Sequence, residues 1–440
     1  MTNTQLIEPN SNMNLSASIY SVMHWLCMPG IILRLAWRAR GNPAYLQDIS
    51  QRFGFGDVLS IDRPLVWLHA VSVGEAQAAI PLIRNFQERY PHYQVLVTTT
   101  TPTGRDRIRN ILGDTVELCY MPYDLPFALK RFIRRVRPKF VLIMETELWP
   151  NLFALCARYR IPIYLVNARL SERSASGYRR FSTVTQRMLS QVSGIAAQSQ
   201  SDATRLLSLG ANPDRLYVTG SIKFDTQHPA SLREQAEVLR RYWGTDRSVL
   251  IAASTHEGED ARLLDAYDDI KKVIPSCLLV LVPRHPERFA PVAALCQKRG
   301  MSLALRSQVN EKIQNADVFI GDSMGELPLF YAASDVAFVG GSLVEIGGHN
   351  MLEPAALGLP VLFGPHVFNF SRISSLLLDC GAARQIKDKD QLIEAAIELL
   401  SDANLRQSMG DLGRQVVEQN RGAIEEVMHM LESTALQPNN

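Results

Sequence analysis

Two series of short apolar runs, separated by amphipathic stretches, most constrain what this 440-residue chain can fold into. The first series consists of LVWL, QVLVTTT, VELCYM, FVLIME, IPIYLVN and GIAAQS, and the second of SVLIAAS, CLLVLVP, DVFIGD, DVAFVGG and PVLFGP. Runs of this length that alternate with helical patterns are typical of parallel sheets covered by helices. The sequence therefore predicts an α/β fold with two parallel sheets in tandem.

The same pattern divides the chain into four parts. We expect residues 1–44 to be a tail and membrane anchor, residues 45–225 the first domain, residues 226–245 an interdomain linker and residues 246–440 the second domain. The last helices, which follow Lys389, are expected to pack back on the first domain. A hydrophobic content of 46% is enough for two or three cores. The six cysteines are scattered without short spacings, which fits a reducing compartment and indicates neither a zinc site nor a disulfide framework.

Charge is distributed unevenly along the chain. Residues 1–250 contain 30 Lys and Arg against 19 Asp and Glu, whereas residues 251–440 contain 16 against 25. A basic first half indicates a partner that is anionic, either a membrane surface or an acidic substrate. Nucleic acid is not predicted as a partner, because no helix-turn-helix, zinc-finger or aromatic-rich strand pattern accompanies the charge.

The segment Ile19 to Trp37 is almost entirely apolar, and three arginines crowd its C-terminal end, namely Arg34, Arg38 and Arg40. It is marginal as a full membrane span, which needs about 20 apolar residues, and Pro29-Gly30 interrupts it. A cleaved signal peptide fits poorly, because the positive charge follows the apolar run. We expect a membrane anchor, spanning or interfacial, with the following domains on the cytoplasmic side. The alternative is a buried helix of a globular domain.

The stretch PLVWLHAVSVGEA, Pro64 to Ala76, places a carboxylate where the first strand gives way to a helix. Ligands of open α/β sheets bind outside the carboxyl ends of the strands, so Glu75 is positioned for chemistry. The structural alternative is that Glu75 only favours the dipole of the helix that begins there.

A second carboxylate follows a later strand of the first series. Glu145 comes directly after FVLIM, at the edge where Glu75 is expected if the sheet is parallel. Two carboxylates at one edge suit general acid–base chemistry, although a carboxylate there is also a common helix cap. Glu147 can replace Glu145 in this argument, because spacing does not decide which of them points inward.

Basic residues accompany these carboxylates. NARLSERS follows another strand and contains Arg169 and Arg173, and Lys223 lies in the turn TGSIKFD at the predicted domain boundary. A phosphate-bearing acceptor would suit such an edge. Solvated side chains are the alternative for both segments, and also for the nearby run KRFIRRVRPK.

The second half has polar turns after its own strands. Pro283 and Arg284 follow LLVLV, and Arg284 can clamp a phosphate through its planar donors. Gly325 and Glu326 stand at another helix start. In the stretch FVGGSLVEIGGHNMLEP four glycines precede a helix expected near Asn350, which predicts a backbone approach to phosphate. Glu353 can accept hydrogen bonds from ribose hydroxyls, and the alternative is that the glycines only make tight turns.

Several sequence motifs are missing. There is no GxGxxG after the first strand, no Walker lysine loop and no His/Cys cluster with metal spacing. The only DxD, Asp388 to Asp390, precedes an amphipathic helix and is interpreted as a cap. We therefore predict no cofactor and no catalytic metal.

The motifs HAVSVGEA, METELWPN, NARLSERS, TGSIKFD, PRHPERF and GGSLVEIGGHNMLEPAALGLPV occur in this order and extend over both predicted domains. In these motifs the chain closely resembles the 3-deoxy-D-manno-octulosonic acid (Kdo) transferases of Gram-negative bacteria. The resemblance implies a membrane-anchored GT-B glycosyltransferase with two Rossmann-like domains and a cleft between them. It implies transfer of Kdo from CMP-Kdo to a lipid A precursor, in lipopolysaccharide biosynthesis at the cytoplasmic face of the inner membrane.

The resemblance also implies roles for individual residues. Glu75 matches the general base, which deprotonates the acceptor hydroxyl for an inverting displacement, and Glu145 and Lys223 match positions that stabilise the transition state. The segments that match CMP-binding positions contain Pro283, Arg284, Met324, Gly325, Glu326, Asn350, Met351, Leu352 and Glu353. No motif position departs from the family pattern, but none fixes how many Kdo units are added.

Two other functions compete with this interpretation. A GT-B relative acting on a UDP-sugar, such as a nucleotide-sugar epimerase, would lack the Ile19 to Trp37 anchor and would prefer UDP to CMP. A two-domain binding protein of the periplasmic type would need an export signal and would leave Glu75 without a task.

Overall fold

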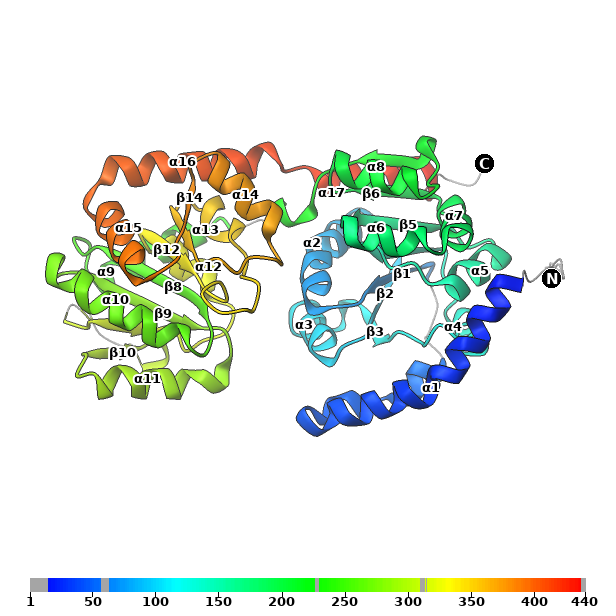
Figure 1. Ribbon diagram of the computed structural model, residues 1–440, viewed down its shortest axis with the longest axis horizontal. Coiled ribbons are helices and arrows are strands. Elements are labelled where there is room, and N and C mark those ends of the chain that lie inside the picture. Colours follow the sequence, from blue (N-terminus) through cyan, green and yellow to red (C-terminus); the bar gives the residue numbers. More distant parts are fainter. Residues whose placement is uncertain (1–14, 57–62, 226–228, 309–312, 314, 437–440) are drawn as a thin grey trace. The chain divides into compact units, whose positions relative to one another are not determined.

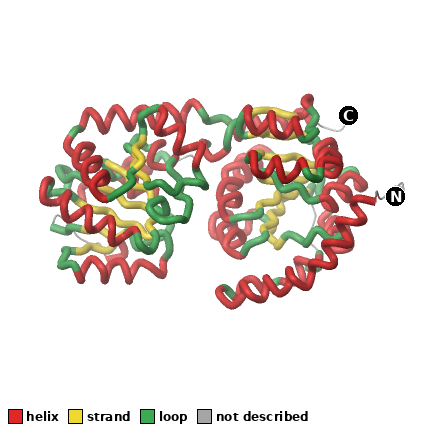
Figure 2. The backbone as a smooth tube through the Cα atoms, viewed as in Figure 1, coloured by secondary structure: helices red, strands yellow, loops and turns green. Residues whose placement is uncertain are grey.

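The computed structural model describes residues 15–56, 63–225, 229–308, 313 and 315–436 (Figure 1). The chain forms two compact units, one made of Met1–Asp225 with Arg421–Asn440 and the other of Thr226–Asn420. Each unit contains a parallel seven-stranded sheet flanked by helices (Figure 2). The predicted α/β fold with two Rossmann-like parallel sheets is confirmed.

The first unit has the strand order β3-β2-β1-β4-β5-β6-β7. Its strands are β1 (Leu65–Ala70), β2 (Gln94–Thr99), β3 (Glu117–Tyr120), β4 (Phe140–Met144), β5 (Ile163–Ala168), β6 (Gly194–Ala197) and β7 (Leu216–Val218). Its helices are α1 (Leu15–Gly41), α2 (Val73–Arg89), α3 (Pro102–Leu112), α4 (Pro126–Val136), α5 (Pro150–Tyr159), α6 (Glu172–Arg179), α7 (Ser182–Ser190), α8 (Gln200–Ser208) and α17 (Ala423–Thr434).

The second unit also has a seven-stranded parallel sheet, but with a different strand order, β10-β11-β9-β8-β12-β13-β14. Its strands are β8 (Val249–Thr255), β9 (Leu278–Pro283), β10 (Leu303–Leu305), β11 (Val318–Ile320), β12 (Val336–Val339), β13 (Val361–Phe363) and β14 (Ala383–Gln385). Its helices are α9 (Leu232–Trp243), α10 (Glu259–Val273), α11 (Phe289–Lys298), α12 (Leu327–Ala332), α13 (Leu352–Ala356), α14 (Ser371–Asp379), α15 (Lys389–Ser401) and α16 (Ala403–Gln419).

Burial on both faces explains why the strands are continuous apolar runs. In β1, Leu65 and Trp67 pack into the core on one face of the sheet, and Val66 and Leu68 pack into the core on the other. Successive side chains of a strand point to opposite faces, so a strand covered by helices on both sides needs apolar residues at every position. With the exception of VELCYM, which forms the edge strand β3, the apolar runs of the sequence are therefore the inner strands of the two sheets.

The predicted linker over residues 226–245 is wrong for its described part. Residues Leu232–Trp243 form α9, which packs Ala236, Leu239 and Trp243 into the core of the second unit. The fully buried Trp243 makes an edge contact with Phe319, so this segment is part of the fold. Apolar residues at helical spacing in LREQAEVLRRYW account for this packing.

The N-terminal region is also part of the first unit. The segment near Tyr45 contains two 3₁₀ turns, η1 (Pro43–Leu46) and η2 (Ile49–Phe53), and buries Arg52 against the ring of Tyr120. Pro29 lies inside α1 and does not end the helix. Among the residues that the structure describes, no helix combines the length and the apolar character needed to cross a membrane.

The C-terminal helix α17 belongs to the first unit. The two carboxylate oxygens of Asp225 accept hydrogen bonds from the backbone N–H groups of Gly422 and Ile424, both at 2.6 Å. These bonds occupy backbone donors at the start of α17, which contacts β6 and α2. In the second unit Asp388 caps α15 by accepting the N–H of Gln391, as its position before an amphipathic helix predicts.

Candidate active site

Glu75 lies at the start of α2, where β1 meets the first helix. It is the third residue of α2, and its side chain is 7% exposed. One carboxylate oxygen accepts the backbone N–H of Val71 at 2.8 Å, and the other accepts the hydroxyl of Ser72 at 2.8 Å. Ser72 in turn accepts the N–H of Glu75, so the two residues form a reciprocal cap of the kind seen in a capping box. The cap holds the carboxyl group at the carboxyl end of β1.

The environment of Glu75 favours its protonated form. Burial, opposed by the hydrogen bonds from Val71 and Ser72, raises the pKa of Glu75 from 4.5 to about 7. The negative charges of Glu145 and Glu147 raise this pKa further. A carboxylate with a pKa near 7 is basic enough to accept a proton from a substrate and is still ionised in a large fraction of molecules at neutral pH.

Glu145 follows β4, the neighbour of β1 at the point where the strand order of the first sheet reverses. Ligands of such sheets bind in the crevice at this point. The backbone of Glu145 has φ +54°, a left-handed conformation that costs a non-glycine residue about 1 kcal/mol or more. Its side chain contacts Arg169 Nε at 3.1 Å and Lys223 Nζ at 4.0 Å. The structure thus brings Glu75, Glu145 and Lys223 into one electrostatic cluster.

Lys223 is carried by a short 3₁₀ turn, η5 (Ile222–Phe224). Burial lowers its pKa, as does Arg169, whereas Glu145 and Glu75 raise it. The amide oxygen of Asn167, at the end of β5, accepts the N–H of Ile222 at 3.2 Å and so fixes this turn. Asn167 has φ +55°, and its buried Nδ2 has no hydrogen-bond partner within the described part of the chain. Sequence reasoning missed this support for Lys223, although Asn167 opens the motif NARLSERS.

Glu147 does not take the place of Glu145. Its carboxylate accepts the indole N–H of Trp149 at 3.0 Å, and burial raises its pKa. The two carboxylates differ in their contacts, because Glu145, and not Glu147, is paired with Lys223 and Arg169.

The second unit places Pro283 at the end of β9 and Arg284 immediately after it. The backbone N–H of Arg284 donates to Thr255 at the end of β8, at 3.0 Å. The side chain of Asn350 accepts the N–H of Leu352, the first residue of α13, and donates to Glu353, both at 3.1 Å. The predicted nucleotide-binding residues of this unit therefore lie at the end of β9, before α12 and at the start of α13.

Three of the predicted nucleotide-binding residues have side chains that are buried or already paired within the protein. The side chains of Met351 and Leu352 are buried in the core, which leaves only their backbone for a ligand. Glu326 receives two hydrogen bonds from Arg306, at 2.8 and 3.0 Å, which lower its pKa. Met324 is exposed, and Gly325 adopts φ +89° in the turn between them.

Three of the four glycines in the turn after β12 use their N–H groups within the protein. The N–H of Gly340 donates to Ala253, and the N–H of Gly348 donates to Gly341. The N–H of Gly341 donates to the carboxylate of Glu259 at 2.7 Å. Glu259 is fully buried and also accepts N–H groups from His256, Ser342 and Leu343. An internal carboxylate thus occupies the anion site that the glycines create.

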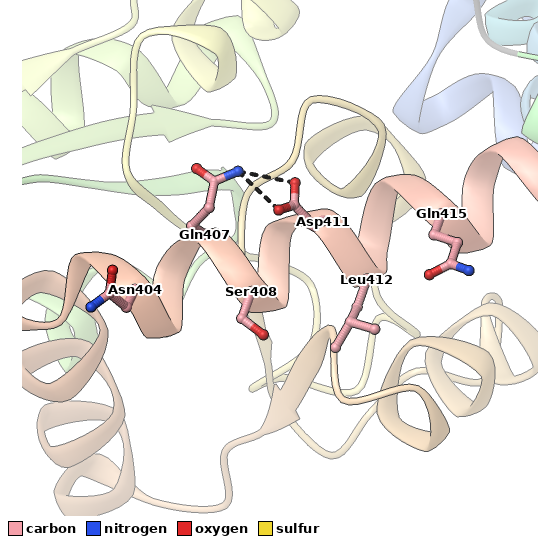
Figure 3. A pocket seen from close by; sticks show the side chains of 6 residues that line it. All are labelled: Asn404, Gln407, Ser408, Asp411, Leu412 and Gln415. Atoms are coloured by element: carbon pink, nitrogen blue, oxygen red, sulfur yellow. Dashed lines mark hydrogen bonds between the residues drawn. The ribbon is translucent and has the colours of Figure 1, made fainter.

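Two hollows on the surface of the protein lie away from these residues. One lies along the face of α16 (Figure 3), where Gln407 donates to both carboxylate oxygens of Asp411 at 3.0 Å. The other lies between α2 and α3 and is lined by Arg84, Gln87, Glu88, Ile111, Leu112 and Thr115. Within the described ranges no group of three or more His, Cys, Asp and Glu is arranged to hold a metal ion.

Sequence and structure comparisons agree with the organisation of these two units. The family described as 3-deoxy-D-manno-octulosonic-acid transferase (kdotransferase) matches residues 47–226, and the glycosyl transferases group 1 family matches residues 261–416. The 3-deoxy-D-manno-octulosonic acid transferase of Haemophilus influenzae is 42% identical, and the alignment covers 94% of this chain and 97% of that protein. The protein of the same name from Bordetella pertussis is 38% identical, with 83% of this chain and 86% of that protein covered.

Solved structures show the same fold with different sequences. The UDP-GlcNAc 2-epimerase of Neisseria meningitidis, solved with UDP-GlcNAc, matches with a TM-score of 0.58 at 14% identity, over 84% of this chain and 100% of that one. At that identity the likeness establishes the fold alone, so it does not support the epimerase alternative. The two domain families and the identity over nearly the whole chain do establish descent, and this chain belongs to the 3-deoxy-D-manno-octulosonic acid transferases, a family of glycosyltransferases.

Proposed function

We propose that this enzyme transfers Kdo from CMP-Kdo to a lipid A precursor, with inversion at the anomeric carbon and with Glu75 as the general base. The observation that carries the proposal is the buried carboxyl group of Glu75, which has a pKa of about 7 at the point where the strand order of the first sheet reverses. No metal ion is assigned a role in this mechanism.

Proton transfer to Glu75 starts the reaction. The ionised carboxylate takes the proton of the acceptor hydroxyl, and the oxygen attacks the anomeric carbon of Kdo as the bond to the CMP phosphate breaks. The electron pair of that bond leaves with CMP, and a single displacement inverts the configuration. A proton acceptor with a pKa near the working pH is the most effective general base, which fits the value for Glu75.

The charged neighbours of Glu75 can stabilise the charges that develop as the sugar is transferred. Lys223, held by Glu145 and by the turn that Asn167 fixes, can stabilise negative charge that develops during transfer. Glu145 can stabilise the positive charge that develops at the anomeric centre. In the second unit Arg284 can bind the phosphate of CMP, and Asn350 and Glu353 beside α13 can bind the cytidine part.

Mass spectrometry of the reaction product tests this proposal. The wild-type enzyme incubated with CMP-Kdo and a lipid A precursor is expected to give an acceptor whose mass increases by one or more Kdo units. The same enzyme supplied with UDP-GlcNAc is expected to give no glycosylated product. Absence of Kdo addition with CMP-Kdo would refute the proposed substrates.

We further propose that α1 attaches the enzyme to the anionic cytoplasmic surface of the inner membrane. The helix buries Met28, Leu35 and Ala39 against the protein and exposes apolar side chains elsewhere. The side chains of Leu26, Leu33 and Trp37 are 75%, 70% and 68% exposed. Arginines near the same end of the helix add electrostatic attraction to anionic lipids, as is typical of interfacial helices.

The triple variant Leu26→Ser/Leu33→Ser/Trp37→Ser is expected to bind phosphatidylglycerol vesicles at least about tenfold more weakly in flotation assays, because each apolar side chain contributes about 1.5 kcal/mol or more when buried. The control Val273→Ser/Phe368→Ser removes two exposed apolar side chains from the second unit and is expected to bind like the wild type. Equal vesicle binding by the triple variant would exclude α1 as the attachment site.

A further inference from the structure

Two histidines that have no role in the proposed mechanism meet at the carboxyl edge of the second sheet. His256 follows β8, and His349 lies in the segment between β12 and α13. β8 and β12 are neighbours at the point where the strand order of this sheet reverses. Because ligands of open α/β sheets bind in the crevice at that point, the two histidines are positioned to contact a ligand of the second unit.

The two imidazole rings form a hydrogen-bonded pair. Their Nε2 atoms are 2.7 Å apart, and the ring planes differ by only 8°. One Nε2 must donate a proton and the other must accept it, so the neutral pair carries a single proton between the rings. The pair can gain one further proton on an Nδ1 atom without losing this bond, but a second would place two N–H groups face to face. The histidines therefore titrate together and take up one proton.

The surrounding backbone is shaped to hold this pair. Gly341 has φ +67°, and a Cβ at this position would lie 2.9 Å from Cδ2 of His349 and 3.5 Å from Cδ2 of His256. Glu259 accepts the N–H groups of both His256 and Gly341, at 2.9 and 2.7 Å, and so fixes the backbone next to both rings. This part of the glycine turn makes room for the histidines instead of a phosphate.

Positive charge surrounds the pair from neighbouring elements. Arg284 and His285 follow β9, and Arg288 lies in η6 (Pro286–Arg288). Burial and then the positive charges of Arg284, His256 and His285 lower the pKa of His349 to about 3, and the pKa of His256 is also lowered. The nearby carboxylates are engaged by other groups: Asp260 by Arg288 and Thr255, Glu259 by backbone N–H groups and Glu353 by Asn350.

We propose that the His256–His349 pair and Arg284 form a receptor for an oxyanion of the sugar donor, and that the pair takes up one proton when this anion binds. The inference rests on the proposed binding of CMP-Kdo by the second unit. Burial and the neighbouring positive charges keep the imidazoles neutral, and the negative charge of a bound oxyanion opposes both effects. The added Nδ1 proton then donates a charge-assisted hydrogen bond to the oxyanion. Two groups of the donor have this chemistry, the phosphate of the nucleotide and the carboxylate of Kdo.

Proton uptake can be measured directly by isothermal titration calorimetry. The wild-type enzyme is titrated with CMP at pH 7 in two buffers that differ in ionisation enthalpy, and the difference in apparent binding enthalpy gives the number of protons taken up. Titrations with cytidine and with free Kdo form the other two arms. If the phosphate is the bound oxyanion, we expect CMP binding to be accompanied by the uptake of up to one proton. If the carboxylate is the bound oxyanion, we expect proton uptake with free Kdo. Cytidine is expected to cause no proton uptake in either case.

Variants identify the histidines as the source of the proton signal. His256→Asn and His349→Asn are each expected to abolish the uptake and to weaken binding of the responsible ligand about tenfold or more, the loss of one charge-assisted hydrogen bond. Gly341→Ala keeps both histidines but displaces the ring of His349, and it is expected to reduce the uptake as well. His366→Asn, a half-buried histidine of the same unit, is the control and is expected to behave like the wild type.

The outcomes separate this inference from the proposed function. Binding of CMP without proton uptake in either the CMP or the Kdo arm would overturn the inference, as would normal uptake in a folded His256→Asn or His349→Asn enzyme. Neither result would affect Kdo transfer or its dependence on Glu75. Failure of CMP to bind the second unit at all would instead remove the donor site on which the inference rests.

Discussion

Replacing Glu75 by glutamine is expected to slow Kdo transfer by about 10²- to 10⁴-fold, the usual contribution of a general base. Glutamine has nearly the same shape and can keep the contacts to Val71 and Ser72, but it cannot accept the proton of the acceptor hydroxyl. Initial rates measured with saturating CMP-Kdo, together with the dissociation constant for CMP, separate a loss of chemistry from a loss of binding. We expect CMP binding to be unchanged.

The pH dependence of the rate provides a second, independent measure of the same role. Because only ionised Glu75 accepts the proton, kcat/KM of the wild type is expected to fall about tenfold per pH unit below pH 7 and to level off above it. The residual rate of Glu75→Gln is expected to lose this dependence. The control Glu88→Gln, on the exposed side of α2, is expected to retain both the rate and the profile. Near-normal turnover of Glu75→Gln would exclude Glu75 as the base.

The expected loss of activity in Glu75→Gln is not due to unfolding. The reason is the way in which the protonation of Glu75 contributes to the stability of the folded protein. The pKa of Glu75 is higher in the folded protein, about 7, than its ordinary value of 4.5. The stability that its protonated form contributes is complete below about pH 4.5 and is lost as the pH rises through 7. Glutamine cannot ionise and does not lose this contribution. Thermal unfolding at pH 8 is therefore expected to show Glu75→Gln at least as stable as the wild type.

The second large effect is expected at Glu259, where glutamine should destabilise the protein by about 2–6 kcal/mol. The carboxylate accepts four backbone N–H groups, from His256, Gly341, Ser342 and Leu343. The amide of glutamine has a single acceptor oxygen, so its NH₂ group would face two of these buried donors. Each unsatisfied buried donor costs about 1–3 kcal/mol.

Chemical denaturation followed by circular dichroism measures this effect, with Glu257→Gln as the matched control. Glu257 is exposed on the same turn, two residues away, and its replacement is expected to change the unfolding free energy by less than about 0.5 kcal/mol. We also expect Glu259→Gln to weaken CMP binding, because the same carboxylate fixes the backbone beside His256 and His349. An unfolding curve that matches the wild type would show that the four hydrogen bonds contribute little.

Glu75 and Glu259 show how far sequence reasoning reaches into the two sites. Each carboxylate follows the first strand of its sheet and lies in the first turn of the next helix. The family motif singles out Glu75, but the local pattern of strand, turn and helix start is the same for Glu75 and Glu259. Their contacts do so: Glu259 is saturated by backbone N–H groups, whereas Glu75 has one backbone donor, one hydroxyl and two carboxylates nearby.

The segment of α9 and the glycine turn after β12 also show that a sequence pattern can fit two different structures. The apolar residues of α9 repeat at helical spacing, yet a segment between two sheets reads equally well as a connection. Only burial of Trp243 in the second core assigns it to that unit. Likewise the glycines after β12 are compatible with a phosphate loop, and the position of the Glu259 carboxylate decides that the N–H of Gly341 is used internally.

By itself the sequence determined the two parallel sheets, the family and the carboxyl edges at which polar residues gather. Those features depend on local periodicity and on motifs, because a strand buried on both faces must be apolar at every position. Only the tertiary structure decided that Glu75 is buried with a raised pKa, that Asn167 hydrogen-bonds the turn that carries Lys223, and that His256 meets His349. These properties depend on desolvation and on hydrogen bonds between residues far apart in the chain, and no local pattern encodes them.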